Sequence, residues 1–256
     1  MATVRVRDIT IGEGIPKICV PIVGKTANEI LDEAARINKL DFDLVEWRAD
    51  WFDTINDAAA SVSVAQQLNS ILSDDRALLF TIRTAAEGGN YPLPVDDYVR
   101  MNKAAIDSGV IDIVDVELFL GDEVMKDLIS YAHDHEVAVI ASNHDFAATP
   151  PRAEIITRLT RMQDLGADIL KIAVMPNSDS DVIELLAATE EMANNHATQP
   201  IVTMSMGGRG SLSRICGELF GSAITFGCAS QASAPGQIGV EDLHTILTLL
   251  HKSLGN

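Results

Sequence analysis

The chain has 256 residues, of which 47% are hydrophobic and 22% charged, and its formal net charge at pH 7 is −18. This composition is typical of a globular protein, and so negative a charge argues against nucleic acid and anionic membrane surfaces as partners. The cysteines, Cys19, Cys216 and Cys228, are odd in number and form no Cys-x-x-Cys motif, which indicates free thiols in a reducing compartment. Because no apolar run approaches the roughly 18 residues of a membrane span and the N-terminal segment resembles no cleaved signal, we expect a cytoplasmic protein.

Short apolar segments alternate with longer amphipathic segments along the chain. The first segment, Thr3–Ile11, alternates apolar and polar residues and predicts a small β-hairpin. The apolar segments that predict strands buried on both faces are Lys17–Val23, Asp43–Arg48, Ala77–Arg83, Ile111–Leu118, Val137–Ser142, Asp168–Val174, Pro200–Ser205 and Ala223–Gly227.

A stretch with helical periodicity follows each predicted strand. These stretches are Ala27–Lys39, Asp57–Leu72 (the weakest pattern), Asp96–Ser108, Asp122–His135, Arg152–Leu165, Asp179–Asn195, Ser211–Phe220 and Val240–Leu254. Eight strand-then-helix units predict an α/β fold with parallel strands, a (β/α)8 TIM barrel formed by one domain over residues 1–256. The N-terminal hairpin would close the bottom of the barrel. A doubly wound open sheet is the alternative.

The carboxyl ends of the predicted strands are unusually polar, and active sites of TIM barrels gather at that end. Because alternate residues of a strand share a face, three pairs are expected to point together into the barrel mouth. They are Glu46 with Arg48, Thr81 with Arg83, and Asp115 with Glu117.

Lys171 lies among branched aliphatic residues in the sixth predicted strand, where an amine is costly to desolvate unless it is paired or neutral. His144 follows the fifth strand and could exchange protons with Lys171 or with a molecule bound to it. Taken singly, Lys171 could instead extend to solvent, and His144 could be a structural, hydrogen-bonded histidine. The placement of both at the same end of one barrel favours a catalytic pair.

Arg48, Arg83 and Arg214 would give this acidic chain a local positive spot at the barrel mouth. The guanidinium fork matches a carboxylate, so the ligand predicted from the residues alone is a small anion. The alternatives are an internal ion pair between Glu46 and Arg48, and solvated surface positions for Glu87 and Arg214.

The polar strand ends, taken in order, resemble those of the type I 3-dehydroquinate dehydratases of the shikimate pathway. The similar segments run along essentially the whole chain: Glu46-Trp47-Arg48, Phe80-Thr81-Ile82-Arg83, Glu87-Gly88-Gly89, Ser142-Asn143-His144-Asp145-Phe146, Lys171-Ile172-Ala173, Met204-Ser205-Met206 and Ala232-Ser233-Ala234-Pro235-Gly236-Gln237. The chain departs from many relatives in having Pro21 where they carry a serine.

The resemblance implies a TIM barrel, a homodimer, and no metal or organic cofactor. It implies dehydration of 3-dehydroquinate to 3-dehydroshikimate, a syn elimination through a Schiff base on Lys171 with His144 as general acid and base. Glu87 would orient or tune His144, and Arg214 would bind the substrate carboxylate. The residues that would contact the rest of the substrate or cover it are Glu46, Arg48, Arg83, Ser233 and Gln237.

Chemistry of this kind suits the residues, because a protonated imine is an electron sink that acidifies the neighbouring carbon. The lysine must be neutral to attack, and we expect burial and nearby arginines to favour that state. Two other classes of function stay open on the sequence. One is a metal-dependent barrel hydrolase using Glu46, Glu117, His144 and Lys171, and the other is a binding protein without activity.

Overall fold

The computed structural model describes residues 3–90, 94–229, 234 and 236–255. Its main sheet is parallel throughout, in the order β11-β10-β3-β4-β5-β6-β7-β8-β9. The strands are β3 (Lys17–Ile22), β4 (Leu44–Arg48), β5 (Ala77–Thr81), β6 (Ile113–Glu117), β7 (Ala138–Asp145), β8 (Ile169–Val174), β9 (Ile201–Ser205), β10 (Ile224–Cys228) and the short β11 (Ile238–Gly239).

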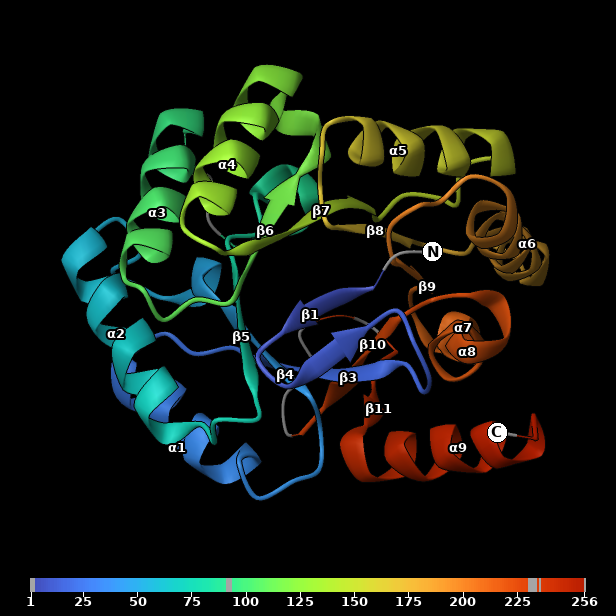
Figure 1. The fold of residues 1–256 in the computed structure, drawn as a ribbon, viewed down its shortest axis with the longest axis horizontal. Helices are drawn as coiled ribbons and strands as arrows, with labels where there is room; N and C mark the ends of the chain where they lie inside the picture. Colours follow the sequence, from blue (N-terminus) through green and yellow to red (C-terminus); the bar gives the residue numbers. More distant parts are fainter. Residues whose placement is uncertain (1–2, 91–93, 230–233, 235, 256) are drawn as a thin grey trace.

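A parallel bridge between Ile201 and Ser222 joins the start of β9 to the residues entering β10 and closes strands β3 to β10 into a ring. The helices surround this ring (Figure 1). They are α1 (Ala27–Ile37), α2 (Ala58–Ile71), α3 (Val95–Asp107), α4 (Asp122–Asp134), α5 (Arg152–Asp164), α6 (Asp179–Asn195), α7 (Ser211–Ile215), α8 (Gly217–Phe220) and α9 (Val240–Ser253). The predicted TIM barrel is therefore confirmed, and the open sheet is not formed.

Each barrel strand alternates between two apolar layers. In β6, Ile113 packs inside the barrel with residues from the other strands, whereas Val114 and Val116 pack outside against the helices. Asp115 and Glu117 therefore share the inner side with Ile113. The same alternation in β8 places Ile169 inside, Leu170 and Ile172 outside, and so turns Lys171 inward.

The predicted N-terminal hairpin forms from β1 (Val4–Val6) and β2 (Ile9–Ile11) and crosses the centre of the ring in Figure 1. Val6, Ile9 and Ile11 bury their side chains in the inner apolar layer at the amino ends of the strands. Arg7 ties the hairpin to the barrel, because its guanidinium lies 2.8 Å from the carboxylate of Asp112, just before β6. The hairpin therefore closes the bottom of the barrel, away from the polar strand ends.

The short strand β11 was not predicted, and β5 ends at Thr81, two residues before its predicted end. Two further elements differ from the sequence prediction. The predicted helix Ser211–Phe220 is broken at Cys216, and the Arg214 carbonyl, which a continuous helix would use for its own ladder, accepts from the Thr225 hydroxyl at 2.8 Å. Strand β7 runs to Asp145, three residues beyond its predicted end, because Asn143, His144 and Asp145 keep pairing with β8.

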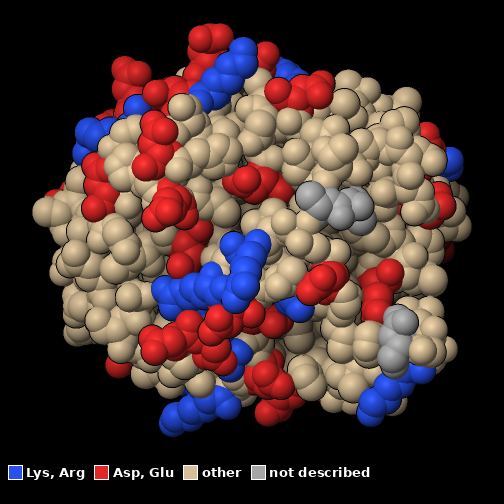
Figure 2. All heavy atoms as spheres, in the orientation of Figure 1, with Lys and Arg blue, Asp and Glu red and all other residues tan. Residues whose placement is uncertain are grey.

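Asp and Glu side chains spread over the face drawn in Figure 2, with Lys and Arg groups among them, in keeping with the net charge of −18. Among the described residues, no helix has both the length and the apolar character needed to cross a bilayer.

Candidate active site

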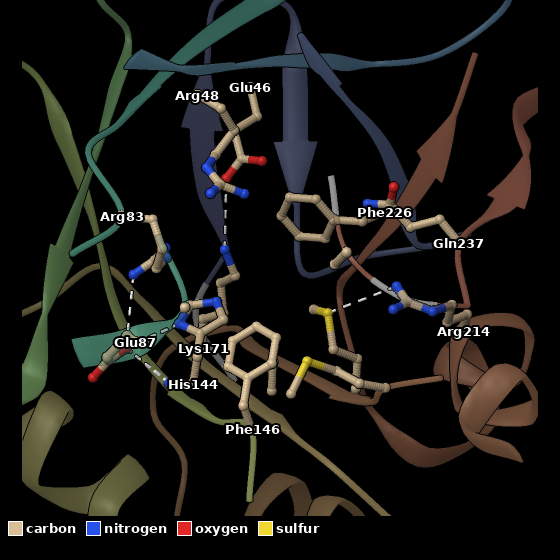
Figure 3. Close-up of a pocket in the computed structure, with 15 residues that line it drawn as sticks. Glu46, Arg48, Arg83, Glu87, His144, Phe146, Lys171, Arg214, Phe226 and Gln237 are labelled. Atoms are coloured by element: carbon tan, nitrogen blue, oxygen red, sulfur yellow. Dashed lines mark hydrogen bonds and ion pairs between the residues drawn. The ribbon is translucent and has the colours of Figure 1, made fainter. Parts of the chain in front are cut away.

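A pocket opens at the carboxyl ends of the barrel strands (Figure 3). Side chains from most strands and from the loops after them line it: Glu46, Arg48, Arg83, Glu87, Gly88, His144, Phe146, Lys171, Ala173, Met204, Met206, Arg214, Phe226, Ala234 and Gln237. The structure thus brings together eight of the nine side chains predicted for the site. The ninth, Ser233, lies outside the described residues.

Lys171 occupies the inner wall of the pocket with 3% of its surface exposed, so it does not extend to solvent. Its Nζ lies 3.4 Å from Asp115 Oδ2 and 3.8 Å from Glu46 Oε1, and 4.5 Å from the centre of the Phe226 ring. Carboxylates, rather than the arginines expected from the sequence, are therefore the charged groups in contact with this amine. They stabilise a positive charge on the nitrogen, whether as an ammonium or as a protonated imine.

His144 stands beside Lys171 because β7 and β8 are neighbours, with Ser142 paired to Lys171 and His144 paired to Ala173. Its Nδ1 lies 3.0 Å from Glu87 Oε2, and its backbone N–H donates to the same oxygen at 2.8 Å. An ionised carboxylate only accepts hydrogen bonds, so this contact places the ring proton on Nδ1 and leaves Nε2 as the basic nitrogen. Burial, together with the charges of Arg83, Lys171 and Arg48, holds the pKa of His144 well below its usual 6.5.

Glu87 is buried rather than solvated, with 5% of its surface exposed. It belongs to the 3-10 turn η2 (Ala85–Glu87) that follows β5. Burial raises its pKa to about 7, and the charge of Glu117 acts in the same direction, whereas Arg83 opposes the shift. The carboxylate that faces His144 therefore changes its charge close to neutral pH.

Arg83 is enclosed by carboxylates. Its guanidinium lies 2.9 Å from Asp115, 2.8 Å from Glu117 and 3.7 Å from Glu87. Burial disfavours its charged form, but these three carboxylates outweigh burial and raise the pKa of Arg83. In return, the pKa of fully buried Asp115 is lowered, because the charges of Arg83 and Lys171 and the Ser142 hydroxyl overcome its desolvation.

Arg48 forms a two-pronged ion pair with Asp50, at 2.8 and 2.9 Å, and not the pair with Glu46 that the sequence left open as an alternative. Asp50 lies in η1 (Ala49–Trp51), just after β4. Glu46 instead accepts from the Thr81 hydroxyl at 3.0 Å and approaches Lys171. The predicted positive spot is therefore wrong for Arg48 and Arg83, because buried carboxylates match both charges.

Arg214 lies across the pocket from Arg83 and Glu87, on the same side as Phe226 and Gln237 (Figure 3). It is 2% exposed, so the alternative of a surface position is wrong, and burial lowers its pKa to about 10. Its Nη1 contacts the Met204 sulfur at 3.8 Å. A buried guanidinium that lines the pocket offers a strong interaction to an entering carboxylate.

Several residues of the site carried no predicted role. Asp115 is the main one: its spacing with Glu117 predicted that it faces the barrel mouth, but not that it contacts Lys171. Phe226 and Phe146 also escaped prediction, because an aromatic side chain in a barrel is more often part of the core. Among the described residues, no group of three His, Cys, Asp or Glu side chains is arranged to hold a metal ion. Glu117, one of the ligands considered for a metal, is occupied by Arg83 and Thr84.

The closed barrel and its buried lysine–histidine pocket define a TIM-barrel enzyme. The family model described as type I 3-dehydroquinase matches residues 18–254. A 3-dehydroquinate dehydratase of Salmonella agona is 51% identical over 253 residues, which cover 99% of this chain and 100% of that protein. The chain belongs to the type I 3-dehydroquinase family, as its sequence predicted.

Solved structures agree with this assignment. The type I 3-dehydroquinate dehydratase of Clostridium difficile superposes with a TM-score of 0.96 at 50% identity, over 98% of this chain and 99% of that chain. The 3-dehydroquinate dehydratase of Geobacillus kaustophilus gives a TM-score of 0.95 at 40% identity, over 98% and 97%.

Proposed function

We propose that this enzyme dehydrates 3-dehydroquinate to 3-dehydroshikimate, the third step of the shikimate pathway towards chorismate and the aromatic amino acids. Membership of the type I 3-dehydroquinase family supports the reaction. The observation that supports the mechanism is the buried Lys171 on β8, next to His144 on β7 and across the pocket from Arg214 (Figure 3). The Clostridium difficile relative was solved with covalent modified comenic acid, which agrees with covalent chemistry in such a pocket.

The first stage is imine formation. Lys171 gives up a proton, which neutral His144 can accept, and its nitrogen attacks the C3 ketone. His144 then returns the proton to the former carbonyl oxygen, which leaves as water, so that a protonated imine and a neutral His144 remain. Asp115 and Glu46, which contact the Nζ of Lys171, stabilise the positive charge that the nitrogen keeps, so the imine remains a strong electron sink.

The second stage is elimination. Nε2 of His144 removes a proton from C2, and the electrons move into the imine to form an enamine. The enamine then expels the C1 hydroxyl, which leaves as water with the proton returned by His144. One group serving both transfers implies loss from a single face, which is syn elimination. Water finally hydrolyses the imine, releasing the product and restoring the amine of Lys171.

The two sides of the pocket would bind different groups of the substrate. Arg214 would bind the carboxylate, while Glu46, Arg48 and Arg83 would contact the hydroxyl groups and set the field around them. Gln237, from the loop before β11, would cover the substrate together with Ser233. The paired charges of Arg48 and Arg83 suit neutral hydroxyls better than a second anion.

Borohydride trapping tests this proposal. Adding borohydride with the substrate should reduce the imine and leave the ligand's mass on the peptide that contains Lys171. Lys171→Ala should abolish turnover and trapping but still bind ligand, whereas the exposed Lys126→Ala should behave as the wild type. His144→Ala should slow imine formation and release. A wild-type enzyme that turns over without any adduct would disprove the Schiff base.

We also propose that the enzyme is a cytoplasmic homodimer that needs no metal or organic cofactor and binds neither nucleic acid nor membranes. The resemblance supports the dimer, and the net charge of −18 supports the absence of polyanionic partners. Light scattering should give twice the chain mass of 27.5 kDa, and chelation should leave turnover unchanged.

A further inference from the structure

The two carboxylate oxygens of Glu87 accept hydrogen bonds from side chains on opposite faces of β7. Oε2 faces His144 inside the barrel, as described above. Oε1 accepts from the side-chain amide of Asn143, whose Nδ2 lies 3.0 Å away. Asn143 is the residue between Ser142 and His144 in β7, so its side chain is on the opposite face of the strand from theirs, towards the helices.

Asn143 is in turn held by Arg158 of α5, a helix that packs over β7 and β8 (Figure 1). Nη1 of Arg158 donates to Oδ1 of Asn143 at 2.9 Å. Ionised Glu87 can only accept and Arg158 can only donate, so the two partners together dictate which end of the Asn143 amide faces which group. If the amide turned over, an oxygen would face a carboxylate and an NH2 group would face a guanidinium.

Arg158 is well placed to act as an anchor. Its Nε donates to Glu154 at 2.8 Å, its Nη1 lies 3.6 Å from Asp145, and its guanidinium lies over the Phe119 ring at 5.4 Å. Its side chain is 17% exposed, whereas Asn143 is 2% exposed. Contacts on several sides restrict the guanidinium and make it a fixed donor.

We propose that Arg158 is a positioning residue that acts through Asn143: by fixing the Asn143 amide with Nδ2 towards Glu87, it holds Glu87 on Nδ1 of His144. This inference rests on the proposed role of His144 as the general acid and base. It adds a chain of contacts, Arg158 to Asn143 to Glu87 to His144, that links the outer helix layer to the reacting group.

The charge on Glu87 depends on every group around it. Arg83 stabilises its ionised form, Glu117 opposes it, and the amide of Asn143 and the backbone N–H of His144 stabilise it. Around His144 stand the positive charges of Arg83, Lys171 and Arg48. Around Arg158 stand Asp145 and Glu154. Loss of the Asn143 donor removes a stabilising contact from ionised Glu87, so Glu87 should take up its proton at higher pH.

The test compares Arg158→Met and Asn143→Asp with Arg161→Met. Asn143→Asp keeps the shape of the side chain but removes the donor to Glu87. Arg161 is a matched control on the same helix, since its ion pair with Asp122 is on the surface, at 43% and 47% exposure. Each variant is profiled for kcat and KM from acidic to basic pH, and its thermal unfolding is measured.

In Arg158→Met, kcat at neutral pH should fall about threefold to tenfold, with KM within about twofold. The acidic limb of its pH profile should move up by roughly half a pH unit, and in Asn143→Asp by about one unit or more. Arg158→Lys, which keeps a donor, should recover part of the loss, and Arg161→Met should match the wild type. If the acidic limb stays in place in both Arg158→Met and Asn143→Asp, the inference is wrong.

A second readout separates this inference from the proposed function. NMR titration of labelled histidine in the ligand-free enzyme reports on His144 without turnover. Arg158→Met should change that titration, and Arg161→Met should not. Borohydride trapping in the wild type tests the Schiff base alone. A missing adduct would therefore disprove the mechanism but not the contact chain, and an unchanged titration would disprove the chain but not the mechanism.

Discussion

Oε2 of Glu87 accepts two hydrogen bonds from a single residue, His144, one from its backbone N–H and one from its ring Nδ1. The backbone contact fixes the carboxylate to the strand, and the ring contact then fixes the imidazole to the carboxylate. The basic Nε2 is thereby directed away from Glu87. The backbone contact does not involve the imidazole ring, so it holds the carboxylate in place whichever way the ring turns. The carboxylate held in this way then orients the ring.

Glu87→Gln tests that orientation. Glutamine keeps the shape, but it cannot accept at both oxygen positions, and its NH2 group would compete with the Nδ1 proton for the same place. We expect kcat to fall by roughly tenfold or more, with little change in KM. Steady-state kinetics measure both, and borohydride trapping should still give the adduct at Lys171. Unchanged kcat would mean that Glu87 does not orient His144.

The wild-type pH profile should have an acidic limb near neutrality. Glu87 accepts from the Nδ1 proton only when ionised, and its pKa is raised to about 7, so activity should be full above that pH and fall as the pH drops through it. His144 is not the limiting group, because burial and the nearby charges of Arg83, Lys171 and Arg48 lower its pKa, so it takes up a proton at more acidic pH than Glu87 does. The dependence of kcat/KM on pH measures the pH at which activity falls. An acidic limb that persists in Glu87→Gln would contradict the assignment to Glu87.

The fold and the inward-facing residues could be predicted from the sequence because they follow local rules. Strand-then-helix repetition gives the barrel, and period-two alternation turns Glu46 and Lys171 inward, whereas Arg83 lies two residues beyond the end of β5. The burial of Glu87 could not be predicted, because Glu87 lies in the turn η2 and not in a strand. Its position depends on hydrogen bonds from Asn143 and His144 of β7, which are far from it in the sequence. The hydrogen bond beside the break at Cys216 likewise comes from another strand, from the hydroxyl of Thr225.

Pairing among the buried charges was the least predictable feature. Alternation says which side of a strand a residue faces, but not which of several carboxylates reaches a given guanidinium. Arg48 has a carboxylate two residues away on either side, Glu46 and Asp50. It pairs with Asp50, which lies in the turn η1. Lys171 could be placed in the mouth, yet its contact with Asp115 required the register of β6, β7 and β8.

Asp115→Asn should destabilise the protein by about 3 kcal/mol at neutral pH, because it leaves the buried charges of Arg83 and Lys171 with fewer partners. The pKa of this carboxyl is lowered in the folded state, so its contribution is present above the unfolded value, about 4, and is lost as the pH falls further. Denaturant unfolding at neutral and acidic pH measures the difference between variant and wild type. A difference that grows at acidic pH would contradict the ion-pair explanation.

Arg7→Met should affect stability without affecting catalysis. Arg7 pairs with Asp112 at the bottom of the barrel, where both side chains are about a fifth exposed, at 21% and 18%. A pair of that exposure contributes about 1 kcal/mol. Urea unfolding should show a small loss that shrinks at high salt, with kcat and KM as in the wild type. A substantial loss of activity would show that the hairpin end and the pocket are coupled.

Gly88→Ala should damage both stability and catalysis through the turn that carries Glu87. Gly88 has φ of +82°, which costs an alanine roughly 1 kcal/mol or more. An added Cβ would also overlap the ring of Phe146, which lines the pocket, so either the ring or η2 must move. Movement of η2 would pull Glu87 from His144, and we expect kcat to fall several-fold, in the same direction as in Glu87→Gln but by less.

Gly109→Ala is the matched control for that variant. Gly109 has a similar φ of +70°, but no atom lies within 4 Å of an added Cβ, and the residue does not line the pocket. It should therefore show the backbone cost alone, a loss of stability of about 1 kcal/mol at unchanged kcat. If Gly88→Ala lost no more activity than Gly109→Ala, the ring of Phe146 would have moved rather than η2. The hydrogen bonds of Glu87 to Asn143 and His144 would then be strong enough to hold η2 in place.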